Sequence, residues 1–103
     1  MAVAIKQGDQ YYIPILLKNG KTVITDNDVL VVEAILGGIR KTYPEQILFS
    51  DGAFQFPVTQ QETFGLTDGT KHFEVRVKFN SGDVVGADAD GVTVTLAESK
   101  TVL

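Results

Sequence analysis

The chain has 103 residues, 44% of them hydrophobic and 21% charged, and this length and composition predict a single globular domain over residues 1–103. Nine basic and thirteen acidic residues give a formal net charge of −4, without the clustered Lys and Arg that a nucleic-acid-binding surface needs. The lack of cysteine excludes both a disulfide framework and a thiolate metal site.

The first part of the chain predicts short β-strands joined by tight turns. Ala2–Lys6 is a short apolar lead-in, and Tyr11–Lys18 predicts a strand that is apolar on both faces. Pro14 removes one ladder donor, which predicts a sheet edge or a bulge at that residue. Asn19-Gly20 is a two-residue hairpin signal, and it should join this strand to a second one at Thr22–Ile24.

The middle of the chain predicts further strands and one helical turn. Val29–Leu36 has the apolar content of a buried helix turn, but its β-branched residues and the following glycines favour a strand. Thr59 and Glu62 have the spacing of a capping box, which predicts one helical turn ending near Leu66. Three more strands are expected over Ile39–Tyr43, Ile47–Phe49 and Phe54–Val58, the last two joined by a turn at Ser50-Asp51-Gly52.

The strongest pattern lies near the carboxyl end. Apolar and charged residues alternate strictly over Lys71–Asn80, and a second alternation follows over Gly91–Leu96, as in strands with one buried face. Turn signals recur roughly every 8–12 residues, which is typical of a sandwich or a barrel. We therefore expect an all-β fold of two packed antiparallel sheets. The expected shared core consists of Phe54, Phe56, Val75, Val77, Phe79, Val92 and Val94.

Few residues have the pattern of a metal site. His72 is the only histidine, and a zinc site needs three or four converging ligands, so we expect His72 to face solvent. Asp83, Asp88 and Asp90 resemble part of a calcium loop, but the flanking segments are strands and no glutamate is correctly placed. A solvated hairpin loop is the favoured interpretation of this segment. We expect no metal and no cofactor.

No catalytic arrangement is evident in the sequence. Glu33 lies among apolar residues, and it is either a buried acid with a shifted pKa or, as we favour, a charge that protects an edge strand from unwanted pairing. An enzyme would need a concave site with perturbed carboxylates, for example Glu33 with Asp28. Gly37-Gly38 lacks the Lys-Ser/Thr of a phosphate loop. The sequence therefore favours a protein that is not an enzyme.

Several turn and cap segments together resemble one known family. These segments are Ile5–Asp9 with Ile13-Pro14-Ile15, Asn19-Gly20-Lys21 with Ile24 and Asp28, Phe56–Thr63 with Leu66, and Val94–Leu103. They are similar to segments of phage tail and baseplate β-domains, among them the N-terminal domain of the upper-baseplate protein family. The resemblance implies an immunoglobulin-like antiparallel β-sandwich with one short helical turn near residues 60–66. It also implies a structural role in the virion of a phage or prophage. Upper-baseplate proteins continue beyond this domain, whereas this sequence stops at Leu103.

The expected partners are other virion proteins or further copies of the chain. Tyr11–Lys18 and Val29–Leu36 hold more apolar residues than one sandwich face can bury, which predicts an interface. The residues expected there are Tyr11, Tyr12, Leu16, Leu30 and Val32. An alternative is a free-standing module that binds carbohydrate or another small ligand, with Tyr11, Tyr12 and Tyr43 exposed beside a polar cleft.

Neither a membrane nor a nucleic acid is expected as a partner. The longest apolar run, Val29–Val32, is too short to span a bilayer, and Met1-Ala2-Val3 does not begin a signal peptide. We expect the chain to remain in the cytoplasm during assembly and then to become part of a virion.

Overall fold

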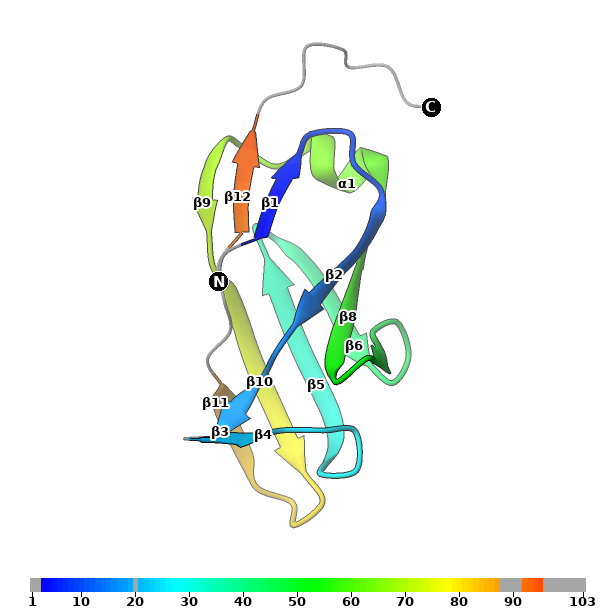
Figure 1. Ribbon diagram of the computed structural model, residues 1–103, viewed down its shortest axis with the longest axis vertical. Helices are drawn as coiled ribbons and strands as arrows, with labels where there is room; N and C mark the ends of the chain where they lie inside the picture. Colours follow the sequence, from blue (N-terminus) through cyan, green and yellow to red (C-terminus); the bar gives the residue numbers. More distant parts are fainter. Residues whose placement is uncertain (1–2, 20, 88–91, 96–103) are drawn as a thin grey trace.

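The computed structural model describes residues 3–19, 21–87 and 92–95. Over these ranges the chain forms twelve strands and one short helix (Figure 1). In chain order they are β1 (Val3–Lys6), β2 (Tyr11–Ile15), β3 (Lys18–Asn19), β4 (Thr22–Val23), β5 (Val29–Leu36), β6 (Ile39–Tyr43), β7 (Leu48–Ser50), β8 (Ala53–Val58), α1 (Gln60–Phe64), β9 (Gly69–Lys71), β10 (Phe73–Phe79), β11 (Val84–Ala87) and β12 (Val92–Thr95). The all-β prediction with one short helix is confirmed.

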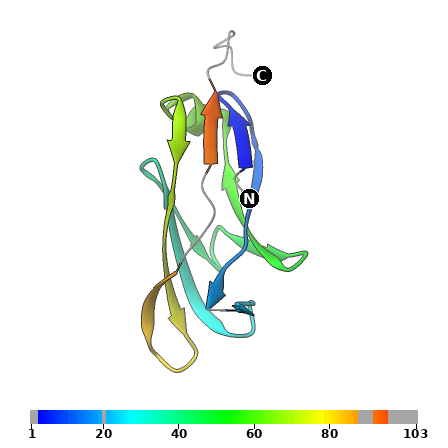
Figure 2. The same cartoon turned by 60° about the vertical axis from the view of Figure 1, so that its left-hand side comes forward.

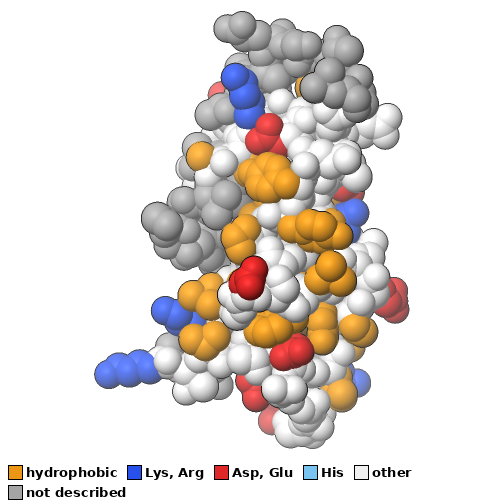
Figure 3. Space-filling model, turned by 45° about the vertical axis from the view of Figure 1, so that its right-hand side comes forward, with side chains coloured by type: hydrophobic (Ala, Val, Ile, Leu, Met, Phe, Trp, Pro, Cys, Tyr) orange, Lys and Arg blue, Asp and Glu red, His pale blue; other side chains and the backbone are white. Residues whose placement is uncertain are grey.

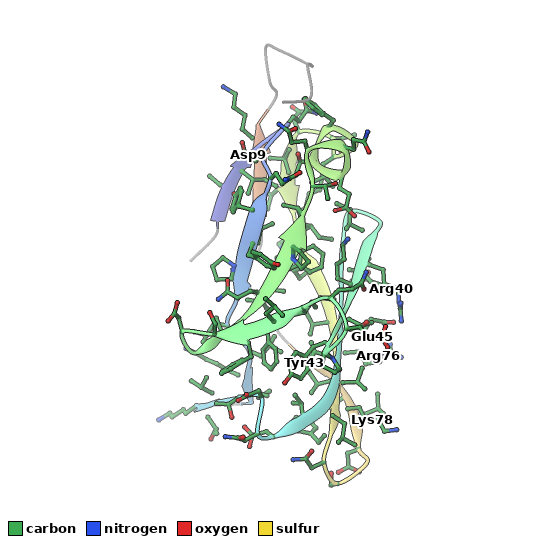
Figure 4. All side chains as sticks on the ribbon, turned by 90° about the vertical axis from the view of Figure 1, so that its right-hand side faces the viewer. Asp9, Arg40, Tyr43, Glu45, Arg76 and Lys78 are labelled. Atoms are coloured by element: carbon green, nitrogen blue, oxygen red, sulfur yellow. The ribbon has the colours of Figure 1, made fainter. Side chains whose placement is uncertain are left out.

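Two antiparallel sheets pack against each other. One has the strand order β2-β8-β7, and the other has the order β11-β10-β5-β6. In the immunoglobulin scheme these orders correspond to strands B-E-D and G-F-C-C′. The two layers lie side by side when the molecule is viewed from the edge (Figure 4). The immunoglobulin-like sandwich is therefore the observed fold.

A third, smaller sheet lies at one end of the sandwich. Its order is β1-β12-β9, with β1 parallel to β12 and β9 antiparallel to it. Only His72 separates β9 from β10, so the long strand of the sandwich continues upward into this sheet (Figure 2). The first and last strands of the described chain are thus direct neighbours.

The predicted core is mostly confirmed. Alternation along β10 buries Val75 and Val77 and exposes the charged residues between them, as the period of a pleated strand requires. Phe79 is half-buried and packs against the core rather than within it. The side chain of Val92 lies outside the described part. The other expected core residues are all buried, namely Phe54, Phe56 and Val94.

The position of β5 corrects one interpretation. The strand predicted over Val29–Leu36 forms with these same bounds. It is an inner strand, however, because it pairs with β10 on one side and with β6 on the other. Our favoured interpretation of Glu33, a charge that protects an edge strand, is therefore wrong. Glu33 lies instead on the outer face of a fully paired strand, where its side chain is half-buried.

Several strand ends differ from prediction by one residue or a few. The strand expected over Tyr11–Lys18 ends at Ile15, and the edge position predicted from Pro14 is confirmed because β2 is the outer strand of its sheet. In the β3–β4 hairpin Asn19 pairs with Thr22, so the turn begins one residue later than expected, and Gly20 lies outside the described residues. Strand β7 starts at Leu48, because the Ile47 amide donates to the Thr42 carbonyl at 2.9 Å and the pairing with β8 begins only at Leu48.

The turn between β7 and β8 has the expected chemistry. Ser50 pairs with Ala53, which leaves Asp51 and Gly52 as a two-residue connection. Both have positive φ, 52° and 77°, as tight hairpin turns require. Asp tolerates this conformation better than most residues, and Gly adopts it freely.

The capping box is confirmed and begins helix α1. The Glu62 amide donates to the Thr59 hydroxyl at 3.2 Å, and the Thr59 amide donates to the Glu62 carboxylate at 3.0 Å. The helix ends at Phe64, slightly earlier than predicted. The second carboxylate oxygen of Glu62 lies 2.9 Å from the Lys41 ammonium, which ties the helix to β6 in the other sheet.

Thr63 attaches the same helix to the loop between β1 and β2. Its side chain is fully buried, and its hydroxyl accepts a hydrogen bond from the Gly8 amide at 2.9 Å. The hydroxyl lies equally close to the carbonyl oxygen of Asp9, to which it donates. A second link, 2.8 Å long, runs from the Gln7 side-chain amide to the Leu66 carbonyl. Helix α1 therefore joins the upper end of the sandwich through polar contacts.

Candidate functional site

The outer face of the β2-β8-β7 sheet is apolar. Register places Tyr12 opposite Pro57, and it places Pro14 and Leu48 on either side of Gln55, so these side chains share one face. Tyr12 and Leu48 are 49% and 50% exposed. Hydrophobic side chains gather across this side of the molecule, with acidic residues among them and Lys and Arg toward the margins (Figure 3). We call Tyr12, Pro14, Leu16, Leu48 and Pro57 the apolar face.

The outer face of the opposite sheet carries more charge. The Arg40 guanidinium donates to the Glu33 carboxylate at 2.7 Å, and Arg76 on β10 lies directly opposite Glu33 in register. Glu74 and Lys78 alternate with Arg76 on the same side of β10. Arg40, Arg76 and Lys78 project away from the sandwich, whereas Tyr43 lies between its layers (Figure 4). These charged, salt-bridged side chains favour exposure of this outer face to water.

Four of the five predicted interface residues are exposed. Tyr11 and Leu16 retain 38% and 44% exposure, and Tyr12 and Leu30 retain 49%. Val32 is wrong as an interface residue because it is fully buried and pairs with Val77 on the inner face. In the apolar run of β5, the sequence does not reveal which residues alternate outward.

Three residues of the apolar face, Pro14, Leu48 and Pro57, are not among the interface residues predicted from the sequence. Leu48 was predicted as part of a strand, but its outward direction follows only from its pairing with Gln55. Pro57 was predicted within the strand Phe54–Val58, but its position opposite Tyr12 again depends on register. The available signal was the predicted core position of Phe56, because alternation along a strand turns the next residue, Pro57, to the opposite face.

The tyrosines expected beside a polar cleft do not form a cluster. Tyr43 is half-buried and makes an edge-to-face contact with Phe54 at a centroid distance of 5.3 Å, so it belongs to the core. Tyr11 and Tyr12 are both exposed on β2. Burial, and then the nearby charge of Asp9, raise the pKa of Tyr11. Tyr11 therefore stays neutral at physiological pH and acts as a hydrogen-bonding and packing group.

A cleft lies at the end of the sandwich farthest from α1. It opens between the β3–β4 segment and the β10–β11 hairpin, and its volume is about 560 Å³. Ile24, Phe79 and Val85 supply apolar surface, and Asp28, Asn80 and Asp83 supply polar groups. In the immunoglobulin scheme these two connections are the B–C and F–G loops, which carry the recognition residues of antibody variable domains.

The residues considered for catalysis and metal binding are not brought together. Asp28 lines the cleft, whereas Glu33 is bonded to Arg40 on the outer face of the sheet. His72 is exposed, as predicted. Over residues 3–19, 21–87 and 92–95, no group of three His, Asp or Glu side chains is placed to hold a metal ion. Of the three calcium-loop candidates, Asp88 and Asp90 lie outside the described residues.

In the described part of the chain, no helix has the length and apolar character needed to cross a membrane. No family model, curated protein or solved structure matches the sequence.

Proposed function

We propose that the protein is a structural component of a phage or prophage particle, such as a tail or baseplate, and that it acts by docking onto another protein rather than by catalysis. The observation that carries this proposal is the apolar face of the β2-β8-β7 sheet. Contiguous exposed apolar surface on a small soluble domain is typical of a protein-binding site. The resemblance of the turn and cap segments to phage tail and baseplate domains supports the proposal that this protein belongs to a phage particle.

The charge around the apolar face favours a different chain as the partner. Asp9 lies close enough to Tyr11 to raise the pKa of that phenol, and Asp51 is exposed at the β7–β8 turn. Two copies brought together through this face would oppose like charges, in a chain whose net charge is already −4. Acidic residues among the apolar side chains favour a partner with basic residues at the matching positions.

The direct test is co-expression with the structural proteins encoded by neighbouring genes, followed by size-exclusion chromatography of the complex. Leu48→Glu places a charge on the apolar face and should abolish complex formation. Val84→Glu is the matched control, because Val84 is 57% exposed on the other sheet, and this variant should still bind. Circular dichroism should show that both variants remain folded.

Equal binding of the two variants would refute the docking face. Failure of every neighbouring structural protein to bind the wild type would refute the virion role. If the wild type were a dimer and Leu48→Glu converted it to a monomer, a second copy of the chain would occupy this face. That result would contradict the proposal that the partner is a different protein.

A further inference from the structure

The two loops that form the end cleft are joined directly to each other. The backbone amide of Asn80 donates to the Asp28 carbonyl at 3.1 Å, and the Asn80 side-chain amide donates to the Asn27 carbonyl at 2.7 Å. Within the β10–β11 turn, the Phe79 amide donates to the Asp83 carbonyl at 2.9 Å. These contacts hold both walls of the cleft in place before any ligand arrives, which lowers the entropic cost of binding.

Within the described residues, the cleft combines an apolar surface with two carboxylates that have no cationic partner. Of the apolar lining residues, Ile24 is buried, the Phe79 ring is half-buried, and Val85 is 49% exposed. Asp28 uses one carboxylate oxygen to accept hydrogen bonds from the amide and hydroxyl of Thr25. Within the described part of the chain, the Asp83 carboxylate has neither a hydrogen bond nor an ion pair. Among the described residues that line the cleft there is no Lys or Arg.

We propose that this cleft binds an arginine or lysine side chain presented by a partner protein. The aliphatic stem would pack against Ile24, Phe79 and Val85, and the cationic end would lie beside Asp28 and Asp83. Lys and Arg side chains suit both parts of the cleft, because each combines an apolar stem with a charged end. An unpaired negative charge at the rim selects a cation, and the face of an aromatic ring adds a further attraction.

Arginine fits better than lysine or a sugar. Its planar guanidinium offers five donors and is weakly hydrated, so it can serve two carboxylates at once. A neutral sugar would leave both carboxylates without a counter-charge. The site is separate from the apolar face and does not depend on it.

The test uses N-acetyl-arginine-N-methylamide as the probe and amide NMR shifts of the ¹⁵N-labelled protein as the readout. Saturable shifts are expected at the amides that surround the cleft, in residues 22–28 and 79–85. The citrulline analogue has nearly the same shape without the charge, and it should bind much more weakly. Asp83→Asn should weaken arginine binding roughly threefold to fivefold, as expected for one partly exposed ion pair.

A matched variant controls for net charge. Asp68→Asn makes the same charge change immediately before β9, at the opposite end of the molecule, and should leave arginine binding unchanged. Leu48→Glu should also bind the probe normally, which separates this site from the docking face.

Three results would overturn the proposal. One is equal binding of arginine and citrulline, and another is shifts confined to residues outside the cleft. The third is binding of N-acetylglucosamine at these amides when arginine causes no shift.

Discussion

Replacing Thr63 by valine should destabilise the protein through two hydrogen bonds rather than through packing. Valine has nearly the same shape, so the fully buried site remains filled. The Gly8 amide loses its acceptor and the Asp9 carbonyl loses its donor, each at 2.9 Å in the wild type. An unsatisfied buried polar group costs about 1–3 kcal/mol. Both groups are only partly buried and can gain some water contact, so we expect a total loss of about 2 kcal/mol in the free energy of unfolding.

Urea unfolding followed by circular dichroism measures this loss. With a typical slope for a small domain, about 2 kcal/mol lowers the midpoint by roughly 1 M urea. Thr63→Ser is the control, because it keeps the hydroxyl and loses one methyl group, at a cost of about 1 kcal/mol. The valine variant should therefore be the less stable of the two, and its Gly8 amide should exchange faster with solvent. A valine variant as stable as the serine variant would refute the assignment of Thr63 as a polar link between α1 and the β1–β2 loop.

Three further substitutions test the core and the helix cap. Val77→Ala should lower the free energy of unfolding, measured with urea, by about 1–3 kcal/mol, because buried surface is lost and a cavity forms. If the urea midpoint stayed unchanged and Lys78→Ala lowered it instead, the assigned faces of β10 would be contradicted. Thr59→Ala should cost about 1 kcal/mol and leave the fold intact, and no change in the midpoint would contradict the cap. Burial raises the pKa of Glu62, but hydrogen bonds from Lys41 and Thr59, with the Lys41 charge, outweigh it and leave that pKa below 4.5. The wild type should therefore be more stable than Glu62→Gln above about pH 4.5 and should lose this advantage as the pH falls through the folded pKa. A pH-independent difference between the two proteins would contradict that contribution.

Features set by local chemistry could be predicted from the sequence. The alternation in β10 defines its buried face because charged residues mark every second position. The capping box needs only residues three positions apart, and both of its hydrogen bonds form. The turn at Asp51 and Gly52 likewise depends on the backbone preferences of those two residues.

Features set by distant pairing could not be predicted. In β5 an almost continuous apolar run conceals which side chains face the core, so Val32 was placed outward when it is buried. The same run gives no sign that β10 and β6 flank it, which led to the wrong interpretation of Glu33. The end cleft combines Asp28 with Asp83, and the sequence indicates each only separately.

The parallel pairing of β1 with β12 has a consequence for synthesis on the ribosome. Val3 pairs with Val92 and Lys6 with Thr95, and within the described chain β1 has no other strand partner. At roughly 5–20 residues per second, β12 is made about 4–17 s after β1. During that interval the backbone of β1 has no strand to pair with, and unpaired strands of nascent chains are prone to aggregate. Strand β1 thus waits for strand β12, which is synthesised much later, and closure of this end of the sandwich is expected to be a late event in folding.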